Sequence, residues 1–219
     1  MLFDDPNTLR FMRRVFAVVS ALAFLCFAAL TSWIRSNPEP SVFDLQFAAR
    51  LFREAAENDV VAKAGRLLDL AGGNIVCLVI VVVVFMLLRR SHHPLLAGYL
   101  LASALGGVLL SSLIKAGVDR QRPATVGLLI EESTSSYPSG HATASVAVFG
   151  ALGLVALAVL SPRIRVWAAS LLMFFGMVVG LSRVWLGVHW PTDVIGGWLL
   201  GTAWTCAVAA LVITTAIRD

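Results

Sequence analysis

Charged residues are scarce in this chain, and their scarcity decides its class. Lys, Arg, Asp and Glu make up only 14% of the 219 residues, whereas 58% of the residues are hydrophobic. A water-soluble domain of this length needs a far larger polar surface, so a soluble protein is excluded. The composition therefore indicates an integral membrane protein.

Cysteine is rare, and segments of alternating hydrophobicity are absent. The three cysteines, Cys26, Cys77 and Cys206, lie inside apolar stretches, where we expect them to pack as small apolar groups and not to form disulfides or bind metal. No ten-residue segment alternates between apolar and polar residues, which excludes a membrane β-barrel. The spans must therefore be helices.

Six apolar stretches are long enough to cross a membrane. A hydrocarbon layer about 30 Å thick takes roughly 20 helical residues. The stretches are about 15–34, 71–88, 94–114, 142–160, 166–182 and 194–216. We expect an all-α fold: one domain over residues 1–219, built as a six-transmembrane-helix bundle with an amphipathic helical outer loop between helices 1 and 2. The first stretch is expected to be a retained helix and not a signal peptide, because its apolar run is long and no cleavage site follows.

The short connections predict the orientation of the bundle. With six spans, both termini share one side with the connections at 89–93 and 161–165. That side carries Arg10, Arg13, Arg14, Arg89, Arg90, Arg163, Arg165 and Arg218. Short Arg-bearing loops face the cytoplasm. We therefore expect cytoplasmic termini, with the longer connections on the opposite, outer face of the membrane.

The long connection at 35–70 reads as helical. Ser41 and Asp44 resemble a capping box at a helix start. Apolar residues then recur at helical spacing, and Asn58-Asp59 interrupts the pattern before it resumes. Such amphipathic helices can form a lid packed on the bundle or a lateral gate for lipids, and the two interpretations are compatible.

Three polar blocks interrupt the apolar chain, and all three fall at the predicted outer face. They are Lys115 with Arg122-Pro123, then Pro138-Ser139-Gly140-His141, then Ser182-Arg183 with His189 and Asp193. Placing a charged side chain at the edge of a membrane span costs free energy, so charged residues retained there usually have a function. Co-location of the three blocks at one membrane depth predicts a single site.

The residue types in these blocks suit phosphate chemistry. Lys115, Arg122 and Arg183 can balance the charge of a phosphoryl group, the arginines by gripping two oxygens at once. Each cation taken alone is more typical of a side chain that extends to the interface or binds headgroups, and Arg120 fits that interpretation better than the site. Glu131 and Glu132 are expected to be solvated loop charges, with attraction of a substrate amine as the alternative.

The second and third blocks add groups for binding and catalysis. The Gly140 amide can approach a phosphate oxygen, and the Ser139 hydroxyl can donate to another. The four-residue spacing of His189 and Asp193 lets the carboxylate hold one ring nitrogen and leaves the other as a nucleophile. A metal site is the weaker alternative, because only His141, His189 and Asp193 are available as ligands and three cations lie nearby.

Order and spacing together resemble the superfamily of type 2 phosphatidic acid phosphatases and vanadium haloperoxidases. That family carries K-x6-RP, PSGH and SR-x5-H-x3-D, and every position is present here, from Lys115 to Asp193. The resemblance implies that His189 attacks phosphorus, oriented by Asp193, and that His141 acts first as general acid and then as base. It also implies that Lys115, Arg122, Ser139, Gly140 and Arg183 bind the phosphoryl oxygens, with no metal and no cofactor.

We therefore predict a metal-independent phosphatase of membrane lipids that works through a phosphohistidine. The resemblance and the compactness of the chain also imply a bacterial inner (plasma) membrane, with the active site on its periplasmic or extracellular face. The candidate substrates are undecaprenyl diphosphate, phosphatidylglycerol phosphate, phosphatidic acid and the phosphates of lipid A, with undecaprenyl diphosphate first. The alternatives are a lipid phosphotransferase and, from another class, a non-catalytic protein that binds or translocates lipids. The expected partners are the lipid substrate and the bilayer, and no nucleic acid. The glycine pairs at 72–73, 106–107 and 196–197 favour close helix contacts within a bundle and between chains alike.

Overall fold

The structure is a computed structural model that describes residues 5–123 and 134–218. Its described residues form eight helices: α1 Pro6–Ser36, α2 Val42–Glu57, α3 Asp59–Ala71, α4 Asn74–Arg90, α5 Pro94–Lys115, α6 Gly140–Val159, α7 Arg165–Trp185 and α8 Pro191–Arg218. The all-α prediction is confirmed. Glu131 and Glu132 lie outside the described residues.

Five of these helices are long and apolar enough to cross a membrane: α1, α5, α6, α7 and α8. A sixth span is obtained only when α3 and α4, which meet at a bend of 50°, are taken together. Helix ends agree with the predicted spans to within about three residues, except that α1 begins nine residues earlier, at Pro6. The Asp5 side chain caps the free amides of Asn7 and Thr8 there, so the helix extends beyond its apolar part.

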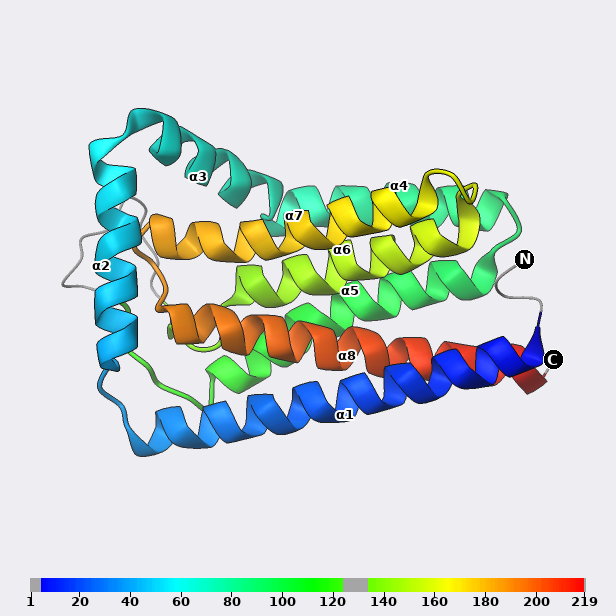
Figure 1. Cartoon of the computed structure of the whole chain (residues 1–219), viewed down its shortest axis with the longest axis horizontal. Helices are drawn as coiled ribbons and strands as arrows, with labels where there is room; N and C mark the ends of the chain where they lie inside the picture. The colour runs from blue at the N-terminus through cyan, green and yellow to red at the C-terminus, as the bar shows by residue number, and fades with distance from the viewer. Residues whose placement is uncertain (1–4, 124–133, 219) are drawn as a thin grey trace.

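The long helices lie side by side, and α6 occupies the centre (Figure 1). It packs against α5, α7 and α8, while α1 lies on α8. Small side chains make this packing possible: Ala142, Ala144, Ala147 and Ala151 of α6 are all buried. In a lipid environment, small residues at interfaces let helices approach closely and gain dispersion contacts.

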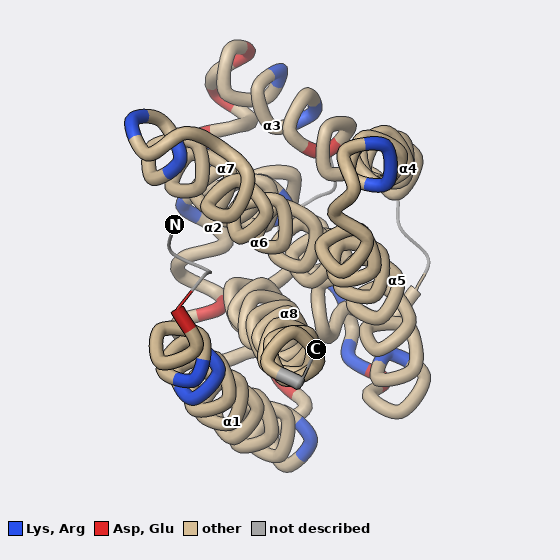
Figure 2. The backbone as a smooth tube through the Cα atoms, turned by 90° about the vertical axis from the view of Figure 1, so that its right-hand side faces the viewer, with Lys and Arg blue, Asp and Glu red and all other residues tan. Residues whose placement is uncertain are grey.

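Both chain ends lie at one end of the bundle, together with the α4–α5 and α6–α7 connections (Figure 1). Figure 2, seen from this end, shows basic residues at the near ends of α1, α4 and α7. The opposite end holds the turn before α6 and the α7–α8 connection, and α2 runs across it (Figure 1). The predicted separation of Arg-bearing loops from the polar blocks is therefore present in the fold.

The connection at 35–70 folds as two helices, as predicted. The Ser41 hydroxyl accepts from the Asp44 amide at 3.0 Å, and the Asp44 carboxylate accepts from the Ser41 amide, so the capping box is confirmed. Asn58 ends α2 and caps α3 through its side chain, which accepts from the Val60 and Val61 amides. Both helices pack on α7, which places them next to the polar end of the bundle.

Candidate active site

A polar cavity of about 290 Å³ lies where the three polar blocks meet. Its lining includes Lys115, Arg122, Gly140, His141 and His189 from those blocks, together with Asn74, Val108, Ser111, Ser112 and Thr134. These residues come from the ends of α4, α5 and α6 and from the two connections beside them. Segments distant in sequence are thus brought to one place, as the spacing of the blocks predicted.

His189 lies in the α7–α8 connection and is buried, with 2% of its surface exposed. Its Nδ1 is 3.4 Å from Oδ2 of Asp193, and its Nε2 is 3.3 Å from Nη1 of Arg122. A guanidinium can only donate hydrogen bonds, so Nε2 is the acceptor of the Arg122 contact. The ring proton is therefore on Nδ1, which donates a hydrogen bond to the Asp193 carboxylate. In this tautomer the lone pair is on Nε2, which faces Arg122 at the wall of the cavity.

The pKa of His189 is lowered to about 3, chiefly by burial, and the nearby charges of Arg122 and Arg183 act in the same direction. The hydrogen bond and negative charge of Asp193 act in the opposite direction but do not outweigh burial. The ring is therefore neutral near neutral pH. A neutral imidazole is the form that can attack phosphorus.

Asp193 is fully buried in the first turn of α8 and is held from several directions. Its Oδ2 accepts from the Trp190 amide at 2.8 Å and from the Ser136 hydroxyl. Its Oδ1 accepts from Nη1 of Arg120 at 2.5 Å. A carboxylate with this many donors has one fixed orientation and stays ionised.

The interpretation of Arg120 as an interfacial cation is wrong. Arg120 is buried, with 4% of its surface exposed, and forms ion pairs with Asp193 and with Asp44 of α2, the latter at 2.9 Å. Asp44 also accepts from the amide and the hydroxyl of Thr192, beside Asp193. Arg120 thus connects Asp44, in the first turn of α2, to Asp193, whose carboxylate contacts His189.

Arg122 and Lys115 reach the cavity from α5 and the segment after it. Arg122 donates to the backbone oxygens of Thr134 and Val188, both at 2.7 Å. Lys115 Nζ donates to the Ser135 oxygen at 2.8 Å. These contacts fix both cations at the wall of the cavity, where their positive charges attract an anion.

His141 and Arg183 share an acidic partner that the sequence did not reveal. Arg183 is fully buried near the end of α7, and its Nη1 contacts Oδ1 of Asp69 on α3. The same oxygen is 3.3 Å from Nε2 of His141. Asp69 of α3 thus contacts two of the predicted site residues at once.

Ser139 and Gly140 form the start of α6. The Ser139 hydroxyl caps the helix by accepting a hydrogen bond from the Ala142 amide at 3.4 Å. The backbone amide of Ser139 donates to the backbone carbonyl oxygen of Asp193 at 3.0 Å. Gly140 lines the cavity, but Ser139 is fully buried behind it and is not part of the lining. The helix start therefore directs its amide end toward the cavity, which favours an anion.

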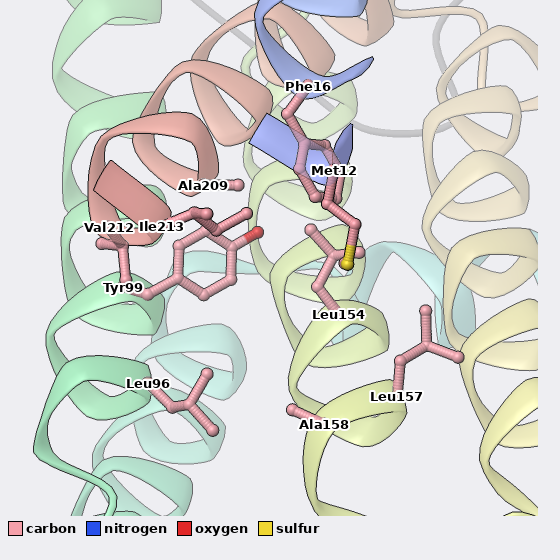
Figure 3. A pocket seen from close by; sticks show the side chains of 10 residues that line it. All are labelled: Met12, Phe16, Leu96, Tyr99, Leu154, Leu157, Ala158, Ala209, Val212 and Ile213. Carbon is pink, nitrogen blue, oxygen red and sulfur yellow. The ribbon is translucent and has the colours of Figure 1, made fainter. Parts of the chain in front are cut away.

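A second cavity, of about 70 Å³, lies toward the end where the termini are and is almost entirely apolar. Figure 3 shows its side chains converging from α1, α5, α6 and α8, with the Tyr99 hydroxyl as the single oxygen among them. It has no cation that could bind a phosphate. Within the described ranges, no cluster of three or more His, Cys, Asp or Glu side chains is arranged to hold a metal ion.

The site and the fold match a known family. The pattern of the PAP2 superfamily matches residues 95–216. The chain belongs to the PAP2 superfamily. The matched range contains all three polar blocks and four of the long helices.

Individual PAP2 proteins resemble parts of the chain. It is 46% identical over 67 residues to an undecaprenyl-diphosphatase from Sulfolobus acidocaldarius, covering 31% of this chain and 29% of the relative. It is 35% identical over 96 residues to phosphatidylglycerophosphatase B from Bacillus subtilis, covering 42% of this chain and 46% of the relative. The chain thus spans less than half the length of these curated relatives.

The fold as a whole resembles a solved PAP2 structure. The crystal structure of a transmembrane phosphatidylglycerolphosphate phosphatase from Bacillus subtilis superposes with a TM-score of 0.72. The superposition covers 86% of this chain and 93% of that one at 24% identity, so it establishes the fold. This chain is accordingly an integral membrane protein with several spans.

Proposed function

We propose that this PAP2 protein hydrolyses a lipid phosphate or diphosphate through a phosphohistidine intermediate and without a metal ion. The observation that carries the proposal is the position of His189, which lines a cavity together with Lys115, Arg122 and His141. Its Nε2 lies beside Arg122, and its Nδ1 contacts Asp193. A nucleophile with an orienting carboxylate and a second titratable group nearby is the arrangement that covalent transfer requires.

In the first step, the Nε2 lone pair of His189 attacks phosphorus and the bond to the lipid oxygen breaks. His141 gives its proton to that leaving oxygen. In the second step, neutral His141 takes a proton from water, whose oxygen attacks phosphorus; the P–N bond breaks and phosphate leaves. His189 recovers its lone pair and His141 its proton, so each turnover restores the site.

Charge on the transferred group spreads over its equatorial oxygens, so positioned cations stabilise it. We assign this role to Lys115 and Arg122, which line the cavity, and to Arg183, which is fully buried and not among the lining residues. The Gly140 amide adds the positive end of α6. Ser139 supports the turn that presents Gly140. These cations supply the electrostatic stabilisation for which many phosphatases use metal ions.

A neighbouring cavity supports a lipid as the substrate. About 340 Å³ of mostly apolar space lies between α4, α5 and α6. It shares Asn74, Val108 and Ser112 with the polar cavity. A phosphate can thus occupy the polar cavity while the hydrocarbon chain attached to it stays among the helices, out of water.

The names of the relatives fit this class. One is an undecaprenyl-diphosphatase and another a phosphatidylglycerophosphatase. For this protein we place undecaprenyl diphosphate first, followed by phosphatidylglycerol phosphate, phosphatidic acid and lipid A phosphates. The Arg-bearing end of the bundle would face the cytoplasm of a bacterium, so the site would open at the outer leaflet of the inner membrane.

Phosphate release by the purified protein in detergent tests the proposal. Wild type and His189→Ala are compared on these lipids, with and without EDTA. The expected result is release by wild type alone, unchanged by EDTA. Equal activity of His189→Ala would refute the nucleophile, and loss of activity with EDTA would refute metal independence. Transfer of radiolabelled phosphate to a second lipid would identify a phosphotransferase instead.

A further inference from the structure

Ser111 of α5 has a hydroxyl that the mechanism above does not use. The residue is buried, with 3% of its surface exposed, and it lines the polar cavity. Within residues 5–123 and 134–218, its Oγ has no hydrogen-bond partner. A buried hydroxyl without a partner costs about 1–3 kcal/mol in proteins, so its presence calls for an explanation.

The next residue shows how unusual this is. Serine within a helix commonly donates to the carbonyl four residues earlier, and Ser112 does so, to the Val108 oxygen at 2.9 Å. Ser111 makes no such bond. Its hydroxyl therefore remains available on the face of α5 that looks into the cavity.

The hydroxyl lies beside the groups that would hold the phosphoryl group. A Cβ placed on Gly140 would be 3.7 Å from Ser111 Oγ and 3.8 Å from Cε of Lys115. The three residues therefore form one wall of the cavity. Ser111 is one helical turn before Lys115, which places it about 6 Å farther from the polar end of the bundle, at 1.5 Å per residue.

That position faces a particular part of a lipid phosphate. The apolar cavity between α4, α5 and α6 adjoins the polar one through Val108 and Ser112, the neighbours of Ser111. A lipid with its phosphoryl group at Lys115 and its hydrocarbon in the apolar cavity would place its leaving-group oxygens between the two. These are ester oxygens in a glycerophospholipid and oxygens of the second phosphate in a lipid diphosphate.

We propose that Ser111 donates a hydrogen bond to an oxygen of the leaving group and so helps this site to prefer lipids that carry a polar group next to the scissile bond. This inference rests on the proposed phosphatase function. Ser111 is a specificity-determining residue in this account, distinct from the groups that hold the phosphoryl oxygens. A bound substrate would supply the partner that the hydroxyl lacks among the described residues.

The test compares Ser111→Ala with wild type on phosphatidic acid, undecaprenyl diphosphate and p-nitrophenyl phosphate, whose aryl leaving group offers no ester or phosphate oxygen beyond the bridging one. We expect kcat/KM to fall about 3- to 12-fold on one or both lipids, which corresponds to the loss of one hydrogen bond, and less than about twofold on p-nitrophenyl phosphate. A loss on phosphatidic acid alone identifies ester oxygens, and a loss on undecaprenyl diphosphate alone identifies the second phosphate.

Thermal stability separates this role from a structural one. Removing an unpartnered hydroxyl should leave Tm unchanged or raise it. Ser103→Ala is the matched control, since Ser103 is a fully buried serine two turns earlier on α5 and outside the cavity lining. We expect that variant to keep wild-type kinetics on all three substrates.

Two results would overturn the inference while leaving the phosphatase intact: unchanged kinetics of Ser111→Ala on both lipids, or an equal loss on all three substrates, which would place the hydroxyl on the phosphoryl group. Failure of wild type itself to release phosphate would instead refute the proposed function on which the inference rests.

Discussion

Arg120 donates a hydrogen bond from Nη1 to Oδ1 of Asp193, and both side chains are buried. The other arm of the same guanidinium contacts Asp44, which lies in the first turn of α2 and belongs to its capping box. The orientation of the carboxylate that contacts His189 therefore depends on a helix lying across the end of the bundle. Two buried carboxylates with one shared cation are stable only while that cation is present.

Arg120→Lys should lower kcat about 10- to 100-fold, the usual range for residues that orient a catalytic group, with little change in KM. Lysine cannot reach both carboxylates with a planar fork, so Asp193 loses its fixed position. Steady-state kinetics on a lipid phosphate measure this. Arg50→Lys serves as the control, because Arg50 of α2 is 79% exposed and pairs only with Glu54 among the described residues. Wild-type kcat in Arg120→Lys would contradict the positioning role.

Asp69→Asn should slow the hydrolysis of alkyl lipid phosphates about tenfold, within the usual range for general acid catalysis, and slow that of p-nitrophenyl phosphate much less. The carboxylate contacts His141, and an aryl leaving group departs without needing a proton. The ratio of the two rates is therefore the measurement. The exposed Asp59, at the start of α3, provides the control Asp59→Asn. Equal losses on both substrates would show that Asp69 does not act through proton donation.

The ring of His189 should remain neutral well below the pH at which ordinary histidines titrate, about 6.5. Its pKa is lowered to about 3 by burial, and a lowered pKa means that the neutral form persists as the pH falls. Nitrogen NMR on protein labelled in its four histidines can follow the ring directly, with His189→Gln assigning the signal. Protonation of His189 at or above pH 6.5 would contradict this electrostatic account.

Gly197→Ala should destabilise the protein by about 1–3 kcal/mol, the cost of overpacking, and should impair activity. A Cβ at Gly197 would lie 2.7 Å from the Ser139 oxygen and 2.8 Å from Cβ of Ala142, so the start of α6 must shift. Gly150→Ala is the matched control, since a Cβ there has no atom within 4 Å. Thermal unfolding in detergent compares the two, and an unchanged Tm for Gly197→Ala would be inconsistent with this packing.

Much of the fold could be predicted because the length of each apolar stretch identifies a membrane-spanning helix and the arginines in short connections indicate its orientation. The site could be located because an even number of crossings returns each polar block to the same end. The capping box of Ser41 and Asp44 could also be predicted, because both of its hydrogen bonds join residues that are close in sequence.

Arg120, Asp69 and Ser111 could not be assigned in this way. Arg120 looks like any basic residue near an interface until Asp44 and Asp193, distant in sequence, are seen to flank it. Asp69 is 114 residues from Arg183. Ser111 lies in an apolar stretch where serine ordinarily bonds its own helix, and only the cavity shows otherwise. In each case tertiary contacts decide the role.

The covalent intermediate tests the central claim most directly. In His141→Ala, p-nitrophenyl phosphate can still phosphorylate His189, because its leaving group needs no acid, but water lacks its base, so the intermediate should accumulate. With the substrate labelled on phosphorus, we predict a burst of p-nitrophenol and an acid-labile label on the peptide that contains His189. No burst and no label, or a label on another residue, would contradict the account.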